Sequence, residues 1–376
     1  MPSKIIKGFE ILWDAERAKE ILLPPHEKIE DMNMKRNPYF ARYGFKVPQY
    51  ISEAYAKYNG IRSDKYISIS LYYFTLTPFL SDVDFCLAYQ DKNMFGRLLP
   101  EVAQPVSLVK NSGGRYLDGE DREIDENEAV AICRDSDSDI VIKVSVEGGG
   151  GNGVQLLKRE ESSETAVRGL FSAYGQNFIV QKRLQQHEVL ASYHASSLNT
   201  MRIYTFRHPV THAYSVLGSA LRFGGGGDFR DNACAGGGFC KIQEDGTVAD
   251  SIHRYACYET VSRSRAGVGC NAPIPVFPDI LRLCKRLHAR IPYMGVVGWD
   301  IALDTNGVPT MVEFNMCPDC ELIQIFNGPM FGDATDELME LVQGMTTTEV
   351  TAFRRSFPGR QNVQHHLYDI RRCHWF

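Results

Sequence analysis

The residues with the clearest chemical potential lie in the stretch VVGWDIALDTNGVPTMVEFN, residues 296–315. An Asn-Gly pair flanked by apolar residues is typical of a β-hairpin with a two-residue type I′ loop, and Asn306-Gly307 stands in that position. With those two residues as the loop, counting back along both strands places Asp300 directly opposite Glu313. Side chains alternate along a strand, so Asn315 is expected on the same face as Glu313.

Two carboxylates that face each other across a strand pair repel unless something neutralises them. A hard divalent cation with oxygen ligands does so, and Mg²⁺ bound together with phosphates needs few carboxylates. The hairpin therefore predicts a Mg²⁺ site at Asp300, Glu313 and Asn315. The alternative is a solvated sheet face on which both acids are merely polar, although an Asp in an otherwise apolar strand needs a reason. The interleaved side chains are expected in the core: Trp299, Ile301, Leu303, Val312 and Phe314.

A second candidate site is the glycine run EGGGGNG at residues 147–153, which follows Lys143 in the apolar stretch IVIKVSV. Glycines this dense let backbone N–H groups close on a phosphate. The run satisfies G-x-G-x-x-G, but the dinucleotide fold requires a helix next, whereas VQLLKR is typical of a strand. No G-K-[ST] follows, which excludes a P-loop. The glycines are therefore interpreted as the tip of a hairpin. Lys143 alone would be an ordinary outward-facing lysine; beside this tip it fits a phosphate contact.

Composition restricts the class of protein. A chain of 376 residues is expected to form two or three lobes. A net charge of −5 argues against a nucleic-acid partner. No apolar run is long enough for a membrane span, and acidic residues interrupt the N-terminal segment where a signal peptide would lie. Ten cysteines without a secretion signal indicate reduced thiols and a cytoplasmic location.

The elements that must position these residues are helices mixed with short strands, which predicts an α+β fold and not a regular βαβ alternation. Residues 66–90 have a β-branched and aromatic pattern. Strands are expected at Gln104–Val109, Arg115–Leu117, Ile140–Val146 and Val154–Leu157, and in NFIVQKRL, TMRIYTF and AYSVLGSALRF. Helices are expected within 8–35, from Asp91 to Pro100, at Ser162–Tyr174, at 278–291 and near Ala334–Met345.

Four stretches together resemble the ATP-grasp superfamily, with its sugar-transferase-associated branch the most similar. They are QDKNMFGRLLP, VIKVSVEGGGGNGV, LNTMRIYTF with DNACAGGG, and GWDIAL with VEFN, and they span about residues 85–335. The resemblance implies an ATP-grasp fold in which the nucleotide lies between two α+β lobes. It implies four segments: a mainly helical N-terminal region (1–104), a small lobe with the glycine-rich hairpin (105–185), a large lobe with the metal site (186–345) and a tail (346–376).

The resemblance also implies a set of nucleotide-binding residues. Lys92 and Lys143 would contact the ATP phosphates. VQKRLQQHE would be the hinge, with residues 181–184 (among them Gln181, Lys182 and Leu184) against the adenine, and His187 or Glu188 at the ribose. The lid over the triphosphate would consist of Gly148, Gly149, Gly150, Gly151 and Gly153.

Catalytic and metal-binding residues follow from the same resemblance. Asp300, Glu313 and Asn315 match the family's Mg²⁺ ligands, with two ions expected, in agreement with the hairpin register. Arg202, Arg222 and Asn232 stand where residues meet a γ-phosphate or an acyl-phosphate, and Lys143 joins them as a catalytic candidate.

Three functions remain open on these residues. The first is an ATP- and Mg²⁺-dependent ligase that joins a small-molecule carboxylate to an amine through an acyl-phosphate, in the synthesis of cell-surface polysaccharide or peptide-like metabolites. The alternative enzyme is a phosphotransferase acting on a sugar or polyol hydroxyl. A nucleotide-binding partner without turnover belongs to a different class. The oligomeric state is left open.

One departure from the family pattern is NMCPDCE after the metal-binding Asn, which brings Cys317 and Cys320 beside the site. A single C-x-x-C can be redox-active or half of a zinc site. Without a clearly placed second pair, two reduced thiols in a turn are the expected state.

Overall fold

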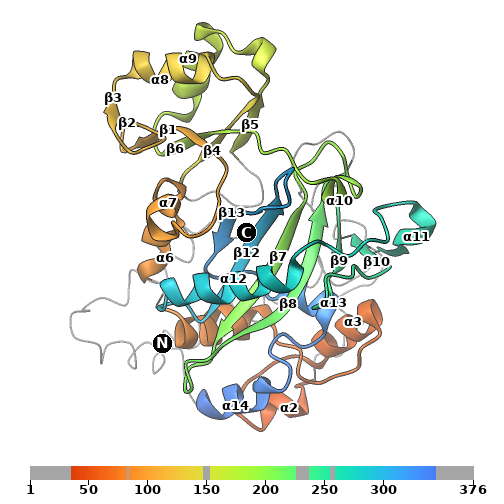
Figure 1. Cartoon of the computed structure of the whole chain (residues 1–376). Helices are drawn as coiled ribbons and strands as arrows, with labels where there is room; N and C mark the ends of the chain where they lie inside the picture. The colour runs from red at the N-terminus through yellow and green to blue at the C-terminus, as the bar shows by residue number, and fades with distance from the viewer. Residues whose placement is uncertain (1–34, 83, 147–152, 226–236, 255–258, 344–376) are drawn as a thin grey trace.

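The computed structural model describes residues 35–82, 84–146, 153–225, 237–254 and 259–343. Figure 1 shows two sheets, one at the top of the view with α8 and α9, and a longer one below it with most of the remaining helices around it. The fold is α+β, as the sequence predicts, with helices and antiparallel strands mixed along the chain. Within the described residues, no helix is both long enough and apolar enough to cross a membrane.

The first sheet has six strands in the order β3-β2-β1-β6-β4-β5. Its helices begin at acidic or hydroxyl caps: Asp125 and Glu128 form a capping box on α8, and Ser163 caps α9. Both helices pack on one face, where Val109, Ile142 and Val180 alternate inward to form the core. The elements are β1 (Ser107–Ser112), β2 (Arg115–Asp118), β3 (Glu123–Ile124), β4 (Ile140–Val144), β5 (Val154–Leu157), β6 (Phe178–Lys182), α8 (Glu126–Arg134) and α9 (Glu164–Tyr174).

The second sheet has seven strands in the order β11-β10-β9-β8-β7-β12-β13. Alternate residues of β7 enter different cores: Met201 and Ile203 lie on the face covered by α12, whereas Tyr204 and Phe206 pack with α13 and the N-terminal helices. The strands are β7 (Thr200–Arg207), β8 (Tyr214–Phe223), β9 (Gly238–Lys241), β10 (Ser251–Arg254), β11 (Glu259–Ser262), β12 (Val296–Leu303) and β13 (Pro309–Asn315). The helices are α10 (Glu188–Ala191), α11 (Arg263–Ala266), α12 (Phe277–Arg290), α13 (Glu321–Asn327) and α14 (Ala334–Leu341), with a short 3₁₀ turn, η4, at Arg159–Glu161.

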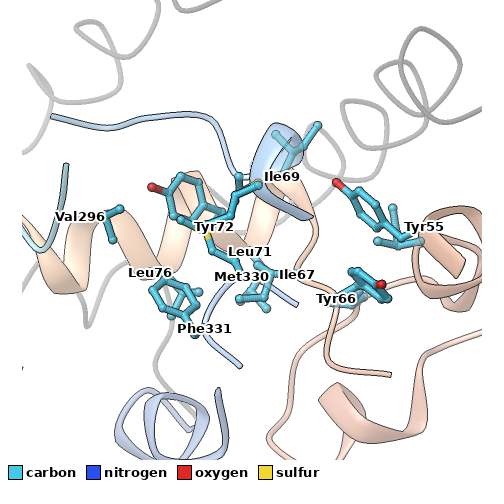
Figure 2. Packing of buried hydrophobic residues seen from close by; sticks show 14 of the residues in the cluster. Tyr55, Tyr66, Ile67, Ile69, Leu71, Tyr72, Leu76, Val296, Met330 and Phe331 are labelled. Atoms are coloured by element: carbon cyan, nitrogen blue, oxygen red, sulfur yellow. The ribbon is translucent and has the colours of Figure 1, made fainter. Parts of the chain in front are cut away.

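The described part of the N-terminal region is helical. The β-branched and aromatic stretch from residue 66 forms helices that include a π-helical turn. The sequence does not indicate this, because a run that is buried on all sides has no periodicity that distinguishes a helix from a strand. Figure 2 shows Tyr72 and Leu76 of this turn packed with Val296, Met330 and Phe331. The elements are α2 (Pro38–Ala41), α3 (Gln49–Asn59), α4 (Ile69–Leu71), η2 (Tyr72–Leu76), α5 (Thr77–Leu80), α6 (Asp84–Gln90), η3 (Lys92–Met94) and α7 (Phe95–Leu98).

Most expected elements are confirmed with small shifts of their ends. β5 has the expected bounds, and α12 and α14 lie where helices were expected. Asp91 caps the turn at Lys92 by accepting a hydrogen bond from the backbone of Asn93 (3.0 Å). The expected helix within 8–35 lies outside the described residues, as does the tail from 346. The division into four segments remains a prediction.

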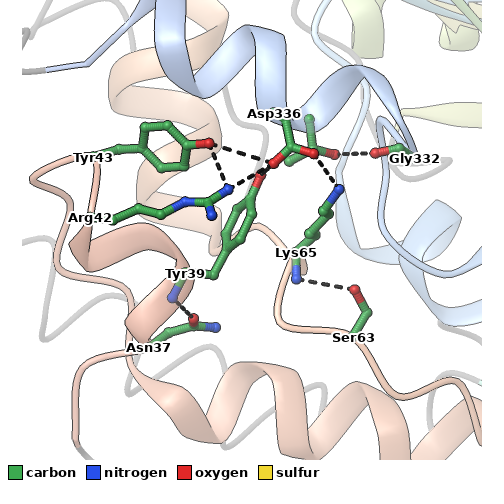
Figure 3. Close-up of polar contacts among 9 residues, drawn as sticks. Asn37, Tyr39, Arg42, Tyr43, Ser63, Lys65, Gly332 and Asp336 are labelled. Carbon is green, nitrogen blue, oxygen red and sulfur yellow. Dashed lines mark hydrogen bonds and ion pairs between the residues drawn. The ribbon is translucent and has the colours of Figure 1, made fainter.

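Asp336 of α14 ties the C-terminal helix to the N-terminal region (Figure 3). Its carboxylate accepts hydrogen bonds from Lys65 (2.6 Å), Tyr39 (2.8 Å) and Arg42 (2.9 Å), and the Arg42 guanidinium lies over the ring of Tyr43. The hydrogen bond from Lys65, followed by that from Tyr39, lowers the pKa of Asp336 below its ordinary value. This cluster joins residues nearly 300 positions apart in the chain.

Replacing Asp336 by Asn is expected to lower the free energy of unfolding by about 1 kcal/mol at neutral pH, a modest value because water screens a half-exposed carboxylate. A lowered pKa in the folded state contributes stability that is complete above the unfolded-state pKa and is lost as the pH falls through the folded-state value. The difference between wild type and variant should therefore shrink in acid. Urea unfolding at several pH values tests this, with Glu340→Gln on the same helix as control. A difference that persists unchanged at pH 2 would contradict it.

Candidate active site

The hairpin β12–β13 has the predicted register at its functional end. Asp300 pairs with Glu313, and Gly298 pairs with Asn315. The loop, however, has three residues and not two: Gly307 donates to the Asp304 carbonyl (2.9 Å), and Asp304 donates to Val308 (3.1 Å). This is a type I turn closed by a left-handed Gly307 (φ 78°). The predicted type I′ loop of Asn306-Gly307 is therefore wrong.

A β-bulge on β13 restores the register. Pairs nearer the loop, such as Ile301 with Met311, are displaced by one residue relative to Asp300 and Glu313. The extra loop residue and the bulge each shift the register by one, in opposite directions. The predicted pairing of Asp300 with Glu313 is therefore confirmed, whereas the pairing predicted for the residues between them and the loop is wrong. Trp299, Ile301, Leu303 and Phe314 are buried in the core as expected, but Met311 takes the core position predicted for Val312.

Asp300 lies at the centre of a group of charges from three adjacent strands. Arg202, its partner on β7, donates from Nε to Oδ1 (2.6 Å) and from Nη2 to Oδ2 (3.0 Å). Arg222 of β8 lies 3.1 Å from Oδ2 and also donates to Thr200. The Asn315 amide lies 3.5 Å from the same oxygen. Arg202, Arg222 and Asn315, all predicted to act on phosphate or metal, thus lie next to Asp300, which is also predicted to bind metal.

The charges explain why a buried carboxylate stays ionised. Asp300 is 1% exposed, and burial alone would raise its pKa. The charges of Arg202 and then Arg222 outweigh burial and hold the pKa of Asp300 below its ordinary value. Breaking such a buried pair by removing one partner is costly, because the remaining charge has no compensation.

Gly298 makes room for the Arg202 side chain. A Cβ at position 298 would lie 2.9 Å from Cβ of Pro318 and 3.3 Å from Cδ of Arg202. The first of these distances is closer than real Cβ contacts, and Pro318 has little freedom to move. The absence of a side chain at 298 therefore makes room first for Pro318 and also relieves a tight approach to the Arg202 side chain that crosses from β7 to Asp300.

Lys92 connects this group to the first sheet. Its backbone N–H donates to the Ser145 carbonyl just beyond β4 (2.9 Å), and its Nζ lies 3.7 Å from Oε2 of Glu313. Asn93 donates to the carbonyl of Asn111 in β1 (2.9 Å). The turn η3 thus spans both sheets and brings Lys92 to the carboxylate hairpin.

The first sheet presents two lysines on the face opposite its helical core. Lys143 of β4 and Lys110 of β1 are both paired with Ile179 of β6, so they stand in one row across the sheet. Lys110 forms an ion pair with Asp121 (2.7 Å), which also pairs with Arg97. Lys110 was not among the residues predicted from the sequence, although SLVKNS repeats the pattern of a lysine in an apolar strand that is seen at Lys143.

A cavity of about 310 Å³ adjoins this row, between β1 and the segment from η3 to the start of β1. Two lysines are among the residues that line it. Its lining comprises Lys92, Gly96, Pro100, Gln104, Pro105, Val106, Ser107, Lys110 and Gly119.

The glycine run joins two paired strands, since Lys143 of β4 lies opposite Val154 of β5. This confirms that a strand follows the glycines and that the dinucleotide motif is incidental. Gly153 has a left-handed backbone (φ 67°), and its carbonyl accepts from Val144 (3.2 Å). Gly148, Gly149, Gly150 and Gly151 lie outside the described residues, as does Asn232.

The hinge candidates are more scattered. Gln181, buried in β6, donates to the Pro105 carbonyl (3.3 Å), and Leu184 lies just beyond the strand. Lys182 pairs with Asp137 (2.7 Å) at an exposed edge. His187 caps α10, with Nδ1 accepting from the backbone of Val189 (3.2 Å), and Glu188 is the first residue of that helix. Within the described contacts, none of these touches the group around Asp300.

The donor set at the hairpin fits a hard cation. In the described part of the chain no three His, Cys, Asp or Glu side chains gather as a metal site, so a cation here would have two carboxylates. Asp300, Glu313 and the carboxamide of Asn315 supply oxygen donors from adjacent strands, and phosphates of a bound substrate complete such a shell. Glu313 is partly exposed and is the most accessible of the three.

Cys317 and Cys320 of the C-x-x-C segment are not joined by a disulfide. Cys317 is half-buried and Cys320, which precedes α13, is fully buried. Cys234 and Cys240 are the other two cysteines that the sequence brings toward the expected active site; Cys240 is buried in β9, and Cys234 lies outside the described residues. Among the described residues nothing gathers around these thiols in the manner of a zinc site.

A match to a known protein family shows which family the chain belongs to. The model of the sugar-transfer associated ATP-grasp family matches residues 76–337, well over half of the chain. The chain belongs to this family. The ATP-grasp fold expected from the sequence is confirmed by this match, and the Asp300 hairpin, the Lys143 strand and the glycine run all lie inside the matched range. Comparison with curated protein sequences finds no match.

Several solved structures are similar to this chain at low sequence identity. They include D-cycloserine synthetase DcsG (15% identity, 69% of this chain and 73% of that one, TM-score 0.42). The ATP-grasp ligase PsnB with its minimal precursor has 15% identity over 67% of this chain and 61% of its own, with a TM-score of 0.39. The D-alanine–D-alanine ligase of Coxiella burnetii has 10% identity over 72% and 58%, with a TM-score of 0.37. The chain spans less than two thirds of the latter two, and the assignment rests on the family match.

Proposed function

We propose that this ATP-grasp protein is an ATP- and Mg²⁺-dependent ligase that joins a carboxylate to an amine through an acyl-phosphate. The observation that carries the proposal is the group at the β12–β13 hairpin: Asp300 and Glu313 face each other, two arginines contact Asp300, and Lys92 reaches Glu313 from the first sheet. Such a set positions and neutralises phosphate charge and offers no acid–base dyad, which suits phosphoryl transfer.

The roles of the residues follow from their charges. Mg²⁺, when bound, neutralises phosphate oxygens and orients them for in-line transfer. Asp300, Glu313 and Asn315 would hold it. Lys92 and Lys143 would bind the nucleotide phosphates, with the glycine hairpin as a lid and residues 181–188 as the adenine and ribose site. Arg202 and Arg222 would stabilise the transferring phosphoryl group and then the acyl-phosphate, from which the amine displaces phosphate.

A hydroxylamine trap tests the reaction class. Purified protein is incubated with ATP, Mg²⁺, hydroxylamine and a panel of amino, sugar and aliphatic acids. Phosphate release together with a hydroxamate is the expected result, since hydroxylamine intercepts an acyl-phosphate. A product that has gained one phosphoryl group on a hydroxyl, with no hydroxamate from any acid, would overturn the ligase and identify the phosphotransferase instead.

The setting of the reaction is also part of the proposal. The family's description as sugar-transfer associated supports a role in the synthesis of cell-surface polysaccharide or peptide-like metabolites from small-molecule substrates. We place the enzyme in the cytoplasm, where ATP and reduced thiols coexist.

A further inference from the structure

Arg222 has to cross a neighbouring strand to reach Asp300. The strands β8, β7 and β12 are consecutive in the second sheet, so β7 lies between the arginine and the carboxylate. Neighbouring strands are about 4.8 Å apart, and the Arg222 side chain must therefore extend over β7. The residue of β7 that pairs directly with Arg222 is Thr200. Thr200 is thus the position on β7 that can support the crossing side chain.

The Thr200 hydroxyl provides this support. It accepts hydrogen bonds from Nη2 (3.0 Å) and Nε (3.3 Å) of Arg222, and the same Nη2 lies 3.1 Å from Oδ2 of Asp300. Two nitrogens on one edge of the guanidinium therefore share a single oxygen, which sets both the reach and the tilt of the plane. Thr200 is 2% exposed, so water does not compete for this contact.

Thr200 is itself held by the residues around it. The preceding residue, Asn199, is completely buried; its backbone N–H donates to Oε1 of Gln186 (2.9 Å), and its side chain donates to two backbone carbonyls (2.7 and 2.8 Å). Ser197 accepts from the backbone N–H of Gly224, two residues beyond the arginine (3.0 Å). The hydroxyl and the arginine are thus anchored to the same loop.

The two arginines of the site are held differently. Arg202 makes two hydrogen bonds to the Asp300 carboxylate and is 8% exposed, so anionic groups fix its position. Arg222 contacts one oxygen of Asp300, takes its other described contacts from a neutral hydroxyl, and is 17% exposed. Arg222 is therefore the more accessible of the two to a bound phosphoryl group, and its orientation depends on Thr200.

We propose that Thr200 is a positioning residue for phosphoryl transfer: its hydroxyl holds the Arg222 guanidinium in the orientation that stabilises the transferring group. The inference rests on the proposed ligase function and adds a residue that acts through Arg222. A misplacement of about 1 Å costs on the order of 100-fold in rate when it affects a group that stabilises transition-state charge. Binding of ATP, which is assigned to Lys92 and Lys143, should be affected much less.

Replacing Thr200 by Val tests the inference, because Val keeps the branched shape and removes the oxygen. With the acid that gives a hydroxamate, kcat is expected to fall at least about tenfold, while KM for ATP changes by less than about twofold. Thr200→Ser restores the hydroxyl and should keep kcat within about threefold of wild type. Thr310→Val is the matched control: Thr310 is also buried in this sheet, its hydroxyl donates to the Val308 carbonyl (3.1 Å), and kcat should be unchanged.

A double-mutant cycle shows whether Thr200 acts through Arg222. In an Arg222→Met protein the hydroxyl has no guanidinium to hold, so adding Thr200→Val should lower kcat by less than about twofold further. A further loss as large as in the wild-type background would overturn the inference. If Thr200→Val folds poorly, Ser and Ala at position 200 differ by one oxygen, and the Ser protein should have the higher kcat by at least about fivefold.

The remaining outcomes separate this inference from the proposed function. Normal kcat in Thr200→Val, equal kcat for the Ser and Ala proteins, or a loss that Ser does not restore would overturn the positioning role and leave the ligase intact. Absence of hydroxamate from the wild-type protein with every acid would overturn the ligase and the positioning role together.

Discussion

Replacement of Asp300 by Asn is expected to lower the free energy of unfolding of the metal-free protein by about 3 kcal/mol. The reason is the charge that remains: Arg202 is buried and Arg222 is largely so, and both lose the negative charge of Asp300 at 2.6 and 3.1 Å. An Asn keeps the shape of the side chain but supplies one neutral acceptor where two guanidinium groups need compensation. The cost therefore comes from buried cations that lose their nearest carboxylate and not from a cavity.

Urea unfolding in the presence of a chelator measures this cost without any contribution from bound metal. Asp304→Asn is the matched control, because Asp304 lies on the same hairpin, uses one oxygen to accept from two loop N–H groups, and can retain that oxygen as Asn. The control should change stability by less than about 1 kcal/mol. An equal loss in both variants would show that the hairpin, and not the buried ion group, sets the effect.

A double-mutant cycle separates the pair from its surroundings. If Arg202 and Asp300 interact as the geometry indicates, replacing Arg202 by Met in addition to Asp300 by Asn should cost clearly less than the sum of the single changes. Additive losses would mean that the two side chains contribute independently. The cycle thus tests the bidentate contact itself.

The sequence predicts the part of the site that depends on local structure, namely the pairing of residues across one hairpin. Alternation along two strands joined by a short loop is enough to set Asp300 against Glu313. The prediction succeeded through two compensating errors, since the sequence carries no signal that distinguishes the three-residue loop or announces the bulge at Val312. The predicted pairing at the active-site end of the hairpin is therefore confirmed, whereas the core position predicted for Val312 is wrong.

The part that could not be predicted depends on strand order and on distant packing. Arg202 reaches Asp300 only because β7 lies beside β12, a pairing that joins residues almost 100 positions apart. Tyr72 enters the same face because the N-terminal helices cover it, and no periodicity in a fully buried stretch indicates that. Lys110 is different: its pattern matches that of Lys143, and the glycine pair that follows it, Gly113-Gly114, is a shorter signal than the run after Lys143.

Replacement of Glu313 is the second change with a large expected effect, and it should affect turnover without a large effect on stability. Glu313→Gln is expected to lower ATP turnover by at least about 100-fold, the usual loss when one group that stabilises transition-state charge is removed. Stability should change by less than about 1 kcal/mol, because the side chain is 31% exposed and its one described ion pair, with Lys92, is long at 3.7 Å. The contrast with Asp300 follows from burial and from the closer arginine contacts of Asp300, since both are carboxylates at paired positions of the hairpin.

The measurement is ATP-dependent hydroxamate formation at several Mg²⁺ concentrations, alongside urea unfolding of the same preparation. A metal ligand predicts a raised requirement for Mg²⁺ as well as a lower maximal rate, whereas a group that only balances Lys92 predicts neither. Lys92→Met is the informative companion, because it removes the other half of the contact without touching the donor set, and it should raise KM for ATP without shifting the Mg²⁺ requirement. A Glu313→Gln enzyme with normal turnover and normal Mg²⁺ dependence would remove Glu313 from the metal site and leave Asp300 bound to its arginines as a structural ion group.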